Sequence, residues 1–192
     1  MNLLLASKSP RRRDLLTDAG YDFEIVSSPF DETEVDLTSN PAQGVCDIAC
    51  GKAAAAFDTL SDEKKCEAVV LGADTIVVCD GEVLLKPKDE ADAAATLRKL
   101  SGKRHQVHTA VSIISATERE TFVSTTDVYF YELTDAEISA YIETSEPMDK
   151  AGSYGIQGKG GLLVEKIDGD YYNVVGLPIA RTVRALQKYN LK

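Results

Sequence analysis

The sequence predicts an α/β protein with a mixed, partly antiparallel sheet, and three patterns favour this class. An apolar run at residues 2–6 is typical of a short buried strand and leads directly into a helix. Asp80-Gly81 separates two β-rich runs, as expected for a hairpin turn. Two longer β-rich stretches at residues 104–117 and 120–132 are typical of antiparallel neighbours. Because hairpin signals outnumber βαβ units, a doubly wound parallel sheet is disfavoured.

The first helix is expected to begin at an unusual cluster of positive charge. Residues 7–13 hold four of the chain's 21 Lys and Arg residues, although the formal net charge is −10. Ser9 suits the N-cap of this helix, Pro10 its first turn and Gly20 its end. Cations in a first helical turn cost roughly 0.3–1 kcal/mol each unless an anion joins them. A helix N-terminus with serines and arginines binds phosphate well, so the segment predicts a phosphate site in preference to a solvated charge run.

The remaining elements follow from local patterns of apolar, turn and capping residues. The sequence T134-D-A-E137 is a capping box, and the glycine-rich stretch at 146–161 has few apolar anchors. In chain order, the expected elements are a strand at 21–27, a polar acidic loop at 28–40, a helix at 41–57, a hairpin at 67–87, a helix at 89–100, a helix at 134–144, a loop at 146–161, a strand at 162–167 and a helix at 177–189.

The totals predict one domain, residues 1–192, or two small lobes that share a core, and they favour a small anion as the ligand. An excess of acids, 31 against 21 bases, argues against a general nucleic-acid or anionic-membrane binder. No apolar run approaches the roughly 20 residues of a membrane span, and the first residues do not resemble a signal peptide. We therefore expect a cytoplasmic protein that binds neither membrane nor nucleic acid.

The cysteines and histidines are not strong candidates for chemistry. All four cysteines are expected to be reduced and largely buried, as in a cytosolic protein: Cys46, Cys50, Cys66 and Cys79. Cys46 and Cys50 would share a helix face, where a C-x3-C pair favours core packing over zinc binding. His105 and His108 would lie on opposite faces of one strand.

Asp74 lies within an otherwise apolar strand and is the main candidate for catalysis. Burying an unpaired carboxylate costs several kcal/mol, so it needs a metal, a cation or hydrogen-bond donors. It is either a structural aspartate that caps a turn, or a general base or metal ligand. Acidic residues at 31–36 could supply a second oxygen ligand, and hard donors beside phosphate suggest Mg²⁺ or Mn²⁺. Lys52, Lys86 and Lys150 become relevant only if they converge on the same anion.

Six segments together resemble one known family. They are "LASKSPRRRDLL", "GADTIVV", "GEVLLKP", "LSGKRHQVHTAV", "EPMDKAGSYGIQGKGG" and "NVVGLPI", and in this order the chain resembles the Maf family of nucleoside triphosphate pyrophosphatases nearly end to end. The resemblance implies a fold similar to that of the house-cleaning inosine triphosphate pyrophosphatases. In that fold, an elongated mixed sheet with flanking helices forms two lobes around a central cleft. Members are generally cytoplasmic and often homodimeric.

The resemblance also implies an activity and a set of residues for it. The reaction is hydrolysis between the α- and β-phosphates with a divalent cation (Mg²⁺, Mn²⁺ or Co²⁺), and Asp74 matches the family's proposed proton acceptor. Other matching positions comprise the phosphate loop, Ser7, Ser9, Arg11 and Arg12, and the polar cleft positions, Glu32, Lys52 and Lys86. Glu32 and Asp74 are the expected metal ligands. Arg13 lies outside the motif and is expected at the surface, because successive helix positions turn by about 100°.

Three positions indicate which nucleotide is hydrolysed. The branch of the family that prefers dTTP and UTP resembles this chain at Arg11, Thr75 and Gln157, and a glutamine amide complements the acceptor and donor of a uracil or thymine edge. Two alternatives remain open from the sequence. One is a nucleotide-binding regulator of septum formation with incidental hydrolysis, and the other is a sugar-nucleotide or phosphomonoester hydrolase.

Overall fold

The computed structural model describes residues 1–191 and contains a mixed seven-stranded sheet flanked by helices. The sheet order is β2-β1-β3-β5-β6-β7, with β4 paired to β3, and β1 is parallel to both of its neighbours. The pairs β3–β4 and β6–β7 are antiparallel. The strands are β1 (Asn2–Ala6), β2 (Phe23–Ile25), β3 (Ala68–Cys79), β4 (Glu82–Leu84), β5 (Arg104–Ile114), β6 (Arg119–Phe130) and β7 (Val164–Asp168). The predicted α/β class with a mixed, partly antiparallel sheet is confirmed.

The five predicted helices are all present, as α1, α2, α4, α5 and α7, and the structure adds two short helices and several 3₁₀ turns. The α-helices are α1 (Pro10–Asp18), α2 (Pro41–Asp58), α3 (Asp62–Glu67), α4 (Glu90–Leu100), α5 (Asp135–Ile142), α6 (Tyr171–Val175) and α7 (Ile179–Leu186). The 3₁₀ turns are η1 (Glu32–Glu34), η2 (Glu146–Asp149), η3 (Ala151–Ser153) and η4 (Lys159–Leu163). The sequence patterns missed α3 and α6, and the expected loop at 146–161 is mostly 3₁₀ turns.

The chain forms two compact units. One comprises residues 1–74 and 109–124 and the C-terminal segment from Gly176, and the other comprises residues 75–108 and 125–175. The predicted single domain, 1–192, includes Lys192, which lies outside the described residues.

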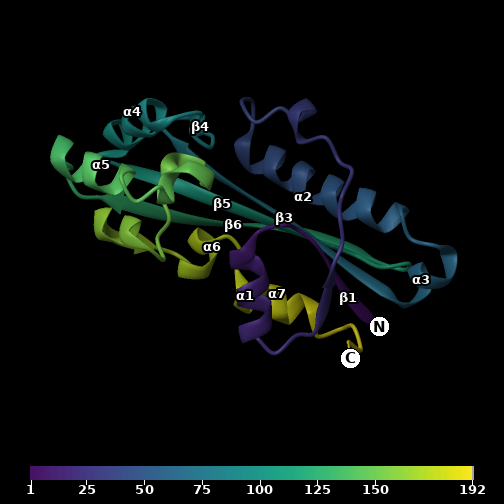
Figure 1. Ribbon diagram of the computed structural model, residues 1–192. Helices are drawn as coiled ribbons and strands as arrows, with labels where there is room; N and C mark the ends of the chain where they lie inside the picture. The colour runs from purple at the N-terminus through teal and green to yellow at the C-terminus, as the bar shows by residue number, and fades with distance from the viewer. Residues whose placement is uncertain (192) are drawn as a thin grey trace. The chain divides into compact units, whose positions relative to one another are not determined.

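In the first unit, α2 packs against β1 and β3. Figure 1 shows α2 on one side of these strands and α1 and α7 on the other. The interface is built from small residues of α2, Ala53 and Ala56, against Leu4 of β1 and Val70 of β3, all of them buried. A Cβ at Gly72 would lie 2.6 Å from the backbone oxygen of Ala49. Glycine is therefore required at position 72, because α2 runs directly over that point of β3.

The core of the second unit lies under α4 and α5. Leu97 and Leu100 of α4 and Ile138 of α5 are almost completely buried. Beside them, His105 of β5 makes edge-on ring contacts with Phe130 and Tyr154, with centroids 4.9 and 5.4 Å away. This packing anchors the segment that follows α5.

Candidate active site

The segment between β1 and α1 ends in a helix N-terminus with uncapped donors. The Ser7 hydroxyl oxygen accepts hydrogen bonds from the Ser9 N–H (3.3 Å) and from Nη1 of Arg12 (3.1 Å). Ser9 is the N-cap residue by position, as expected, but its side chain makes no capping hydrogen bond. The positive end of the helix dipole and the Ser9 hydroxyl are therefore both available to an anion.

Arg12 is tied to the protein to an extent that the sequence patterns did not predict. Its side chain is only 8% exposed; Nε donates to the Gly176 oxygen at 2.8 Å and Nη1 to the Ala73 oxygen at 2.9 Å. Burial lowers the pKa of Arg12, and the nearby Asp74 carboxylate opposes this effect. Arg12 thus joins the start of α1 to the β3 strand just before Asp74, whatever else it binds.

The other two arginines of the first turn are both half-buried. For Arg13 this corrects the expectation of a surface residue, because its Nε atom is enclosed by protein and has no hydrogen-bond partner. Consecutive positions on a helix point in directions about 100° apart, so Arg13 points away from Arg12. At this end of α1 the Arg13 side chain is nevertheless partly covered by protein.

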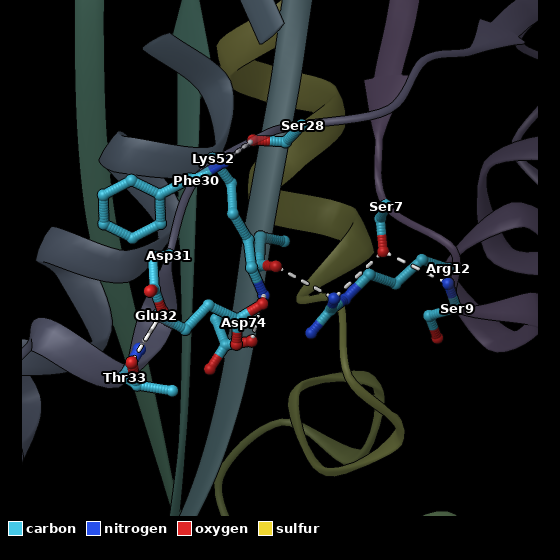
Figure 2. A network of polar contacts seen from close by, with 11 residues as sticks. Ser7, Ser9, Arg12, Ser28, Phe30, Asp31, Glu32, Thr33, Lys52 and Asp74 are labelled. Atoms are coloured by element: carbon cyan, nitrogen blue, oxygen red, sulfur yellow. Dashed lines mark hydrogen bonds and ion pairs between the residues drawn. The ribbon is translucent and has the colours of Figure 1, made fainter. Parts of the chain in front are cut away.

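Asp74, Lys52 and Glu32 form the principal polar cluster of the first unit. Lys52 Nζ lies 2.7 Å from Oδ1 of Asp74 and 2.8 Å from Oε1 of Glu32, as Figure 2 shows. The side chains of Lys52 and Asp74 are 14% and 17% exposed, whereas that of Glu32 is 49% exposed. The structure therefore brings together three residues that the sequence predicts for one site and that come from a strand, a helix and a loop.

Two glycines explain how these three residues meet. Gly72 lets α2 approach β3, and Lys52 and Asp74 lie beside this contact. Gly51 does the same for the acidic loop, since a Cβ there would lie 2.3 Å from the ring of Phe30. With Phe30 seated on α2, Glu32 begins the turn η1, which is capped by Asp31 through a 2.9 Å bond from the Thr33 N–H. A glycine inside a helix or a strand is the sequence signal for such close contacts.

The donor set of this cluster fits a hard divalent cation completed by its substrate. Among the described residues, no group of three or more His, Cys, Asp or Glu side chains is arranged to hold a metal ion. Mg²⁺ nevertheless commonly uses only one or two carboxylates together with water and phosphate oxygens. Glu32 and Asp74 already share one cation, the Lys52 ammonium, so their oxygens face a common point.

The other predicted site residues belong to the second unit. Thr75 follows Asp74 in β3 and is half-buried. Lys86 follows β4, Gln157 lies between η3 and η4, and both are exposed. Neither side chain makes a hydrogen bond or an ion pair with another described residue.

The cysteines are less buried than expected, and the histidines are structural. All four cysteines are free, as predicted, but Cys66 is exposed and Cys46 and Cys50 are only partly buried. Buried His105 bonds Tyr154 Oη at 2.8 Å, and burial lowers the pKa of this histidine to about 4. His108 bonds the Thr125 hydroxyl at 2.8 Å.

Fold and site together define an α/β protein with an anion-binding helix N-terminus and a carboxylate–lysine cluster in one unit. The chain belongs to the Maf family, since the family model described as Maf-like protein matches residues 2–189. It is 52% identical over 190 residues to the dTTP/UTP pyrophosphatase of Bacillus velezensis, covering 99% of this chain and 97% of that protein. It is also 52% identical over 191 residues to the dTTP/UTP pyrophosphatase of Bacillus pumilus, covering 98% and 97%. None of the helices formed by residues 1–191 is both long and apolar enough for a membrane span.

Proposed function

We propose that the protein is a nucleoside triphosphate pyrophosphatase that hydrolyses dTTP and UTP to the monophosphate and pyrophosphate. The observation that carries this proposal is the Asp74–Lys52–Glu32 cluster, which shares a unit with the uncapped N-terminus of α1. The cluster supplies a base and a positive charge for hydrolysis, and the N-terminus of α1 supplies hydrogen-bond donors for phosphate. The names of the relatives at about half identity support the same substrate class.

Asp74 acts as the proton acceptor in this proposal. Its Oδ1 atom accepts a hydrogen bond from Lys52, which orients the carboxylate. The other carboxylate oxygen takes a proton from a water molecule. The water oxygen bonds to the α-phosphorus while the bond from that phosphorus to the oxygen bridging the α- and β-phosphates breaks. Pyrophosphate leaves with the electron pair of that bond, and Lys52 holds the protonated or ionised carboxyl in place throughout.

Glu32 and Asp74 would hold a divalent cation, Mg²⁺, Mn²⁺ or Co²⁺. When bound, such a cation neutralises charge on the phosphate oxygens and on the leaving pyrophosphate. The chain's own residues then complete the charge balance. Lys52 lies between the two carboxylates, and Ser7, Ser9, Arg11, Arg12 and Lys86 bind the triphosphate oxygens.

Thr75 and Gln157 are the proposed base-recognition residues, with Arg11 contributing at the triphosphate side. A glutamine amide can donate to a base carbonyl and accept from N3–H in one plane. The exposed Gln157 side chain makes no hydrogen bond with another residue of 1–191 that would compete for these groups. The enzyme is further proposed to work in the cytoplasm as a homodimer, and its net charge of −10 disfavours nucleic acid as a partner.

A nucleotide panel tests the proposal. Purified protein is incubated with UTP, dTTP, CTP, GTP and ATP in the presence of Mg²⁺, Mn²⁺ or Co²⁺, and pyrophosphate and orthophosphate are measured separately. We expect pyrophosphate release, fastest with UTP and dTTP. Release of orthophosphate would instead indicate a phosphomonoester or stepwise phosphatase, and nucleotide binding without turnover would favour a regulatory role.

A further inference from the structure

The loop that carries Gln157 is attached to two side chains, one contact on each side of that glutamine. The Gly155 N–H donates to the hydroxyl oxygen of Tyr141 at 3.1 Å. After Gln157, the Lys159 N–H donates to Oε1 of Glu146 at 3.1 Å, and the next N–H along the chain reaches Oε2 at 3.4 Å. The backbone is therefore held two residues before Gln157 and again two residues after it, while the Gln157 side chain itself stays exposed.

At Gly158 the loop lies so close to Glu146 that a larger residue would displace the Glu146 carboxylate. A Cβ at Gly158 would lie 2.4 Å from Oε2 of Glu146. Gly158 directly follows Gln157. The Glu146 carboxylate therefore lies against the residue next to the glutamine and also accepts hydrogen bonds from the two residues after it. The glycine at 158 therefore permits a contact that orders the loop.

Tyr141 and Glu146 are themselves well fixed. Tyr141 is 4% exposed, and burial together with the neighbouring Glu146 carboxylate raises the pKa of its hydroxyl to about 12, so it stays protonated. Ser145 has a left-handed backbone with φ of +61°, a conformation that is strained for a non-glycine residue. Lys150 Nζ donates to the Glu146 carbonyl oxygen at 2.6 Å. This bond holds the backbone of Glu146, and the N–H groups of Lys159 and Gly160 hold its carboxylate.

We infer that Glu146 and Tyr141 are positioning residues that order the Gln157 loop for recognition of the pyrimidine base. The inference rests on the proposed function, in which Gln157 reads the base. An exposed side chain on an unrestrained loop would lose both backbone and rotamer freedom on binding, whereas a loop already held at both sides leaves only the rotamers to be fixed. Glu146 and Tyr141 act through the loop and do not contact the nucleotide.

A double-mutant cycle tests whether Glu146 acts through Gln157. Steady-state kcat and KM for UTP are measured for Glu146→Gln, Gln157→Ala and the double variant. Removing one acceptor from the pair of N–H bonds should raise KM about tenfold, with kcat within about twofold because neither Glu146 nor Gln157 belongs to the Asp74–Lys52–Glu32 cluster. We expect the double variant to be no worse than Gln157→Ala alone, since residues that act through one another are not additive.

Two further variants separate this role from a general structural one. Glu143→Gln is the matched control, because Glu143 is an exposed carboxylate at the C-cap of α5, the helix that carries Tyr141, and its side chain makes no hydrogen bond or ion pair with another residue of 1–191; it should leave KM for UTP unchanged. Tyr141→Phe removes the hydroxyl that accepts the Gly155 N–H and that also interacts with the Glu146 carboxylate, and it should raise KM as Glu146→Gln does. It also preserves the test if Glu146→Gln does not fold.

The outcomes distinguish a failure of the inference from a failure of the proposed function. If Gln157→Ala leaves KM for UTP and the UTP-to-GTP ratio of kcat/KM unchanged, Gln157 does not read the base and both fail. If Gln157→Ala raises KM but Glu146→Gln and Tyr141→Phe do not, the positioning role alone is overturned. The same conclusion follows if the effects of Glu146→Gln and Gln157→Ala multiply in the double variant.

Discussion

Asp74 combines an apolar strand environment with a close contact to the Lys52 ammonium. The residue before it is fully buried, yet its own carboxylate is reached by Lys52 at 2.7 Å and keeps 17% of its side-chain surface exposed. A carboxylate of this kind is held by a cation and can still meet a water molecule. This combination suits a general base, which must lie within hydrogen-bond reach of the water that it deprotonates.

Asp74→Asn is expected to keep the fold and lose the activity. The amide still accepts the hydrogen bond from Lys52 but cannot take a proton, and loss of a general base costs about 10²–10⁴-fold in rate. Pyrophosphate release with UTP measures the effect, and Asp58→Asn, an exposed aspartate at the end of α2, is the control. More than about a tenth of the wild-type turnover in Asp74→Asn would contradict the proposed role.

Arg12 and Arg13 should differ sharply in their contributions to stability. Arg12→Ala leaves the Gly176 and Ala73 oxygens without donors in a buried region, at a cost of about 3 kcal/mol in the free energy of unfolding. Arg13→Ala removes an enclosed Nε that has no partner, so its effect should stay within about 0.5 kcal/mol. Urea unfolding measures both.

The nucleotide affinities of Arg12→Ala and Arg13→Ala have to be interpreted together with their unfolding free energies. We also expect Arg12→Ala to weaken nucleotide binding more than Arg13→Ala, but the loss includes the displaced start of α1. Equal losses of stability for both variants would show that the first turn of α1 is oriented differently.

At the scale of elements, the contact of α2 with β3 decides where Lys52 lies. The crossing is set by Gly72, whose missing Cβ would meet backbone atoms of α2, the Ala49 oxygen at 2.6 Å and the Ala53 nitrogen at 2.8 Å. Backbone atoms of a packed helix cannot move singly, so any side chain at position 72 must displace the helix.

Gly72→Ala should therefore reduce both stability and activity. Overpacking of this kind costs about 1–3 kcal/mol, and the displaced helix moves Lys52 away from Asp74. Thermal unfolding and UTP hydrolysis by the remaining folded protein are the two measurements. Full specific activity in the folded fraction would mean that the Lys52–Asp74 contact does not depend on the close approach of α2.

At the scale of the whole molecule, buried His105 makes stability depend on pH. Burial lowers the pKa of His105 to about 4 in the folded protein, whereas an unfolded histidine titrates near 6.5. The unfolded state therefore binds more protons between these two values, and the stability of the fold falls as pH is lowered from about 6.5 toward 4.

The loss should approach about 3 kcal/mol at the lower end of that window. Urea unfolding between pH 7 and pH 5 measures the upper part of the loss, and His105→Gln, which cannot titrate, should show a shallower dependence. Because burial also lowers the pKa of His108, part of the dependence should remain in that variant. An identical pH profile for His105→Gln and the wild type would contradict this assignment.

The sequence by itself determined the fold class and most helix positions, and it predicted the residues of the candidate site. Local signals suffice for these, because a hairpin turn, a capping box or an N-terminal serine and proline acts within a few residues. The three short features that it missed, α3, α6 and the turns after α5, have too few residues to show a period.

Only the tertiary structure decided which of those residues meet and what else they do. It placed Lys52 between Asp74 and Glu32, tied Arg12 to Gly176, and bonded Tyr141 and Glu146 to backbone N–H groups before and after Gln157. The first of these contacts depends on how closely the Phe30 ring approaches Gly51 and how closely the backbone of α2 approaches Gly72. Such distances follow from packing the whole core, which no window of the sequence contains.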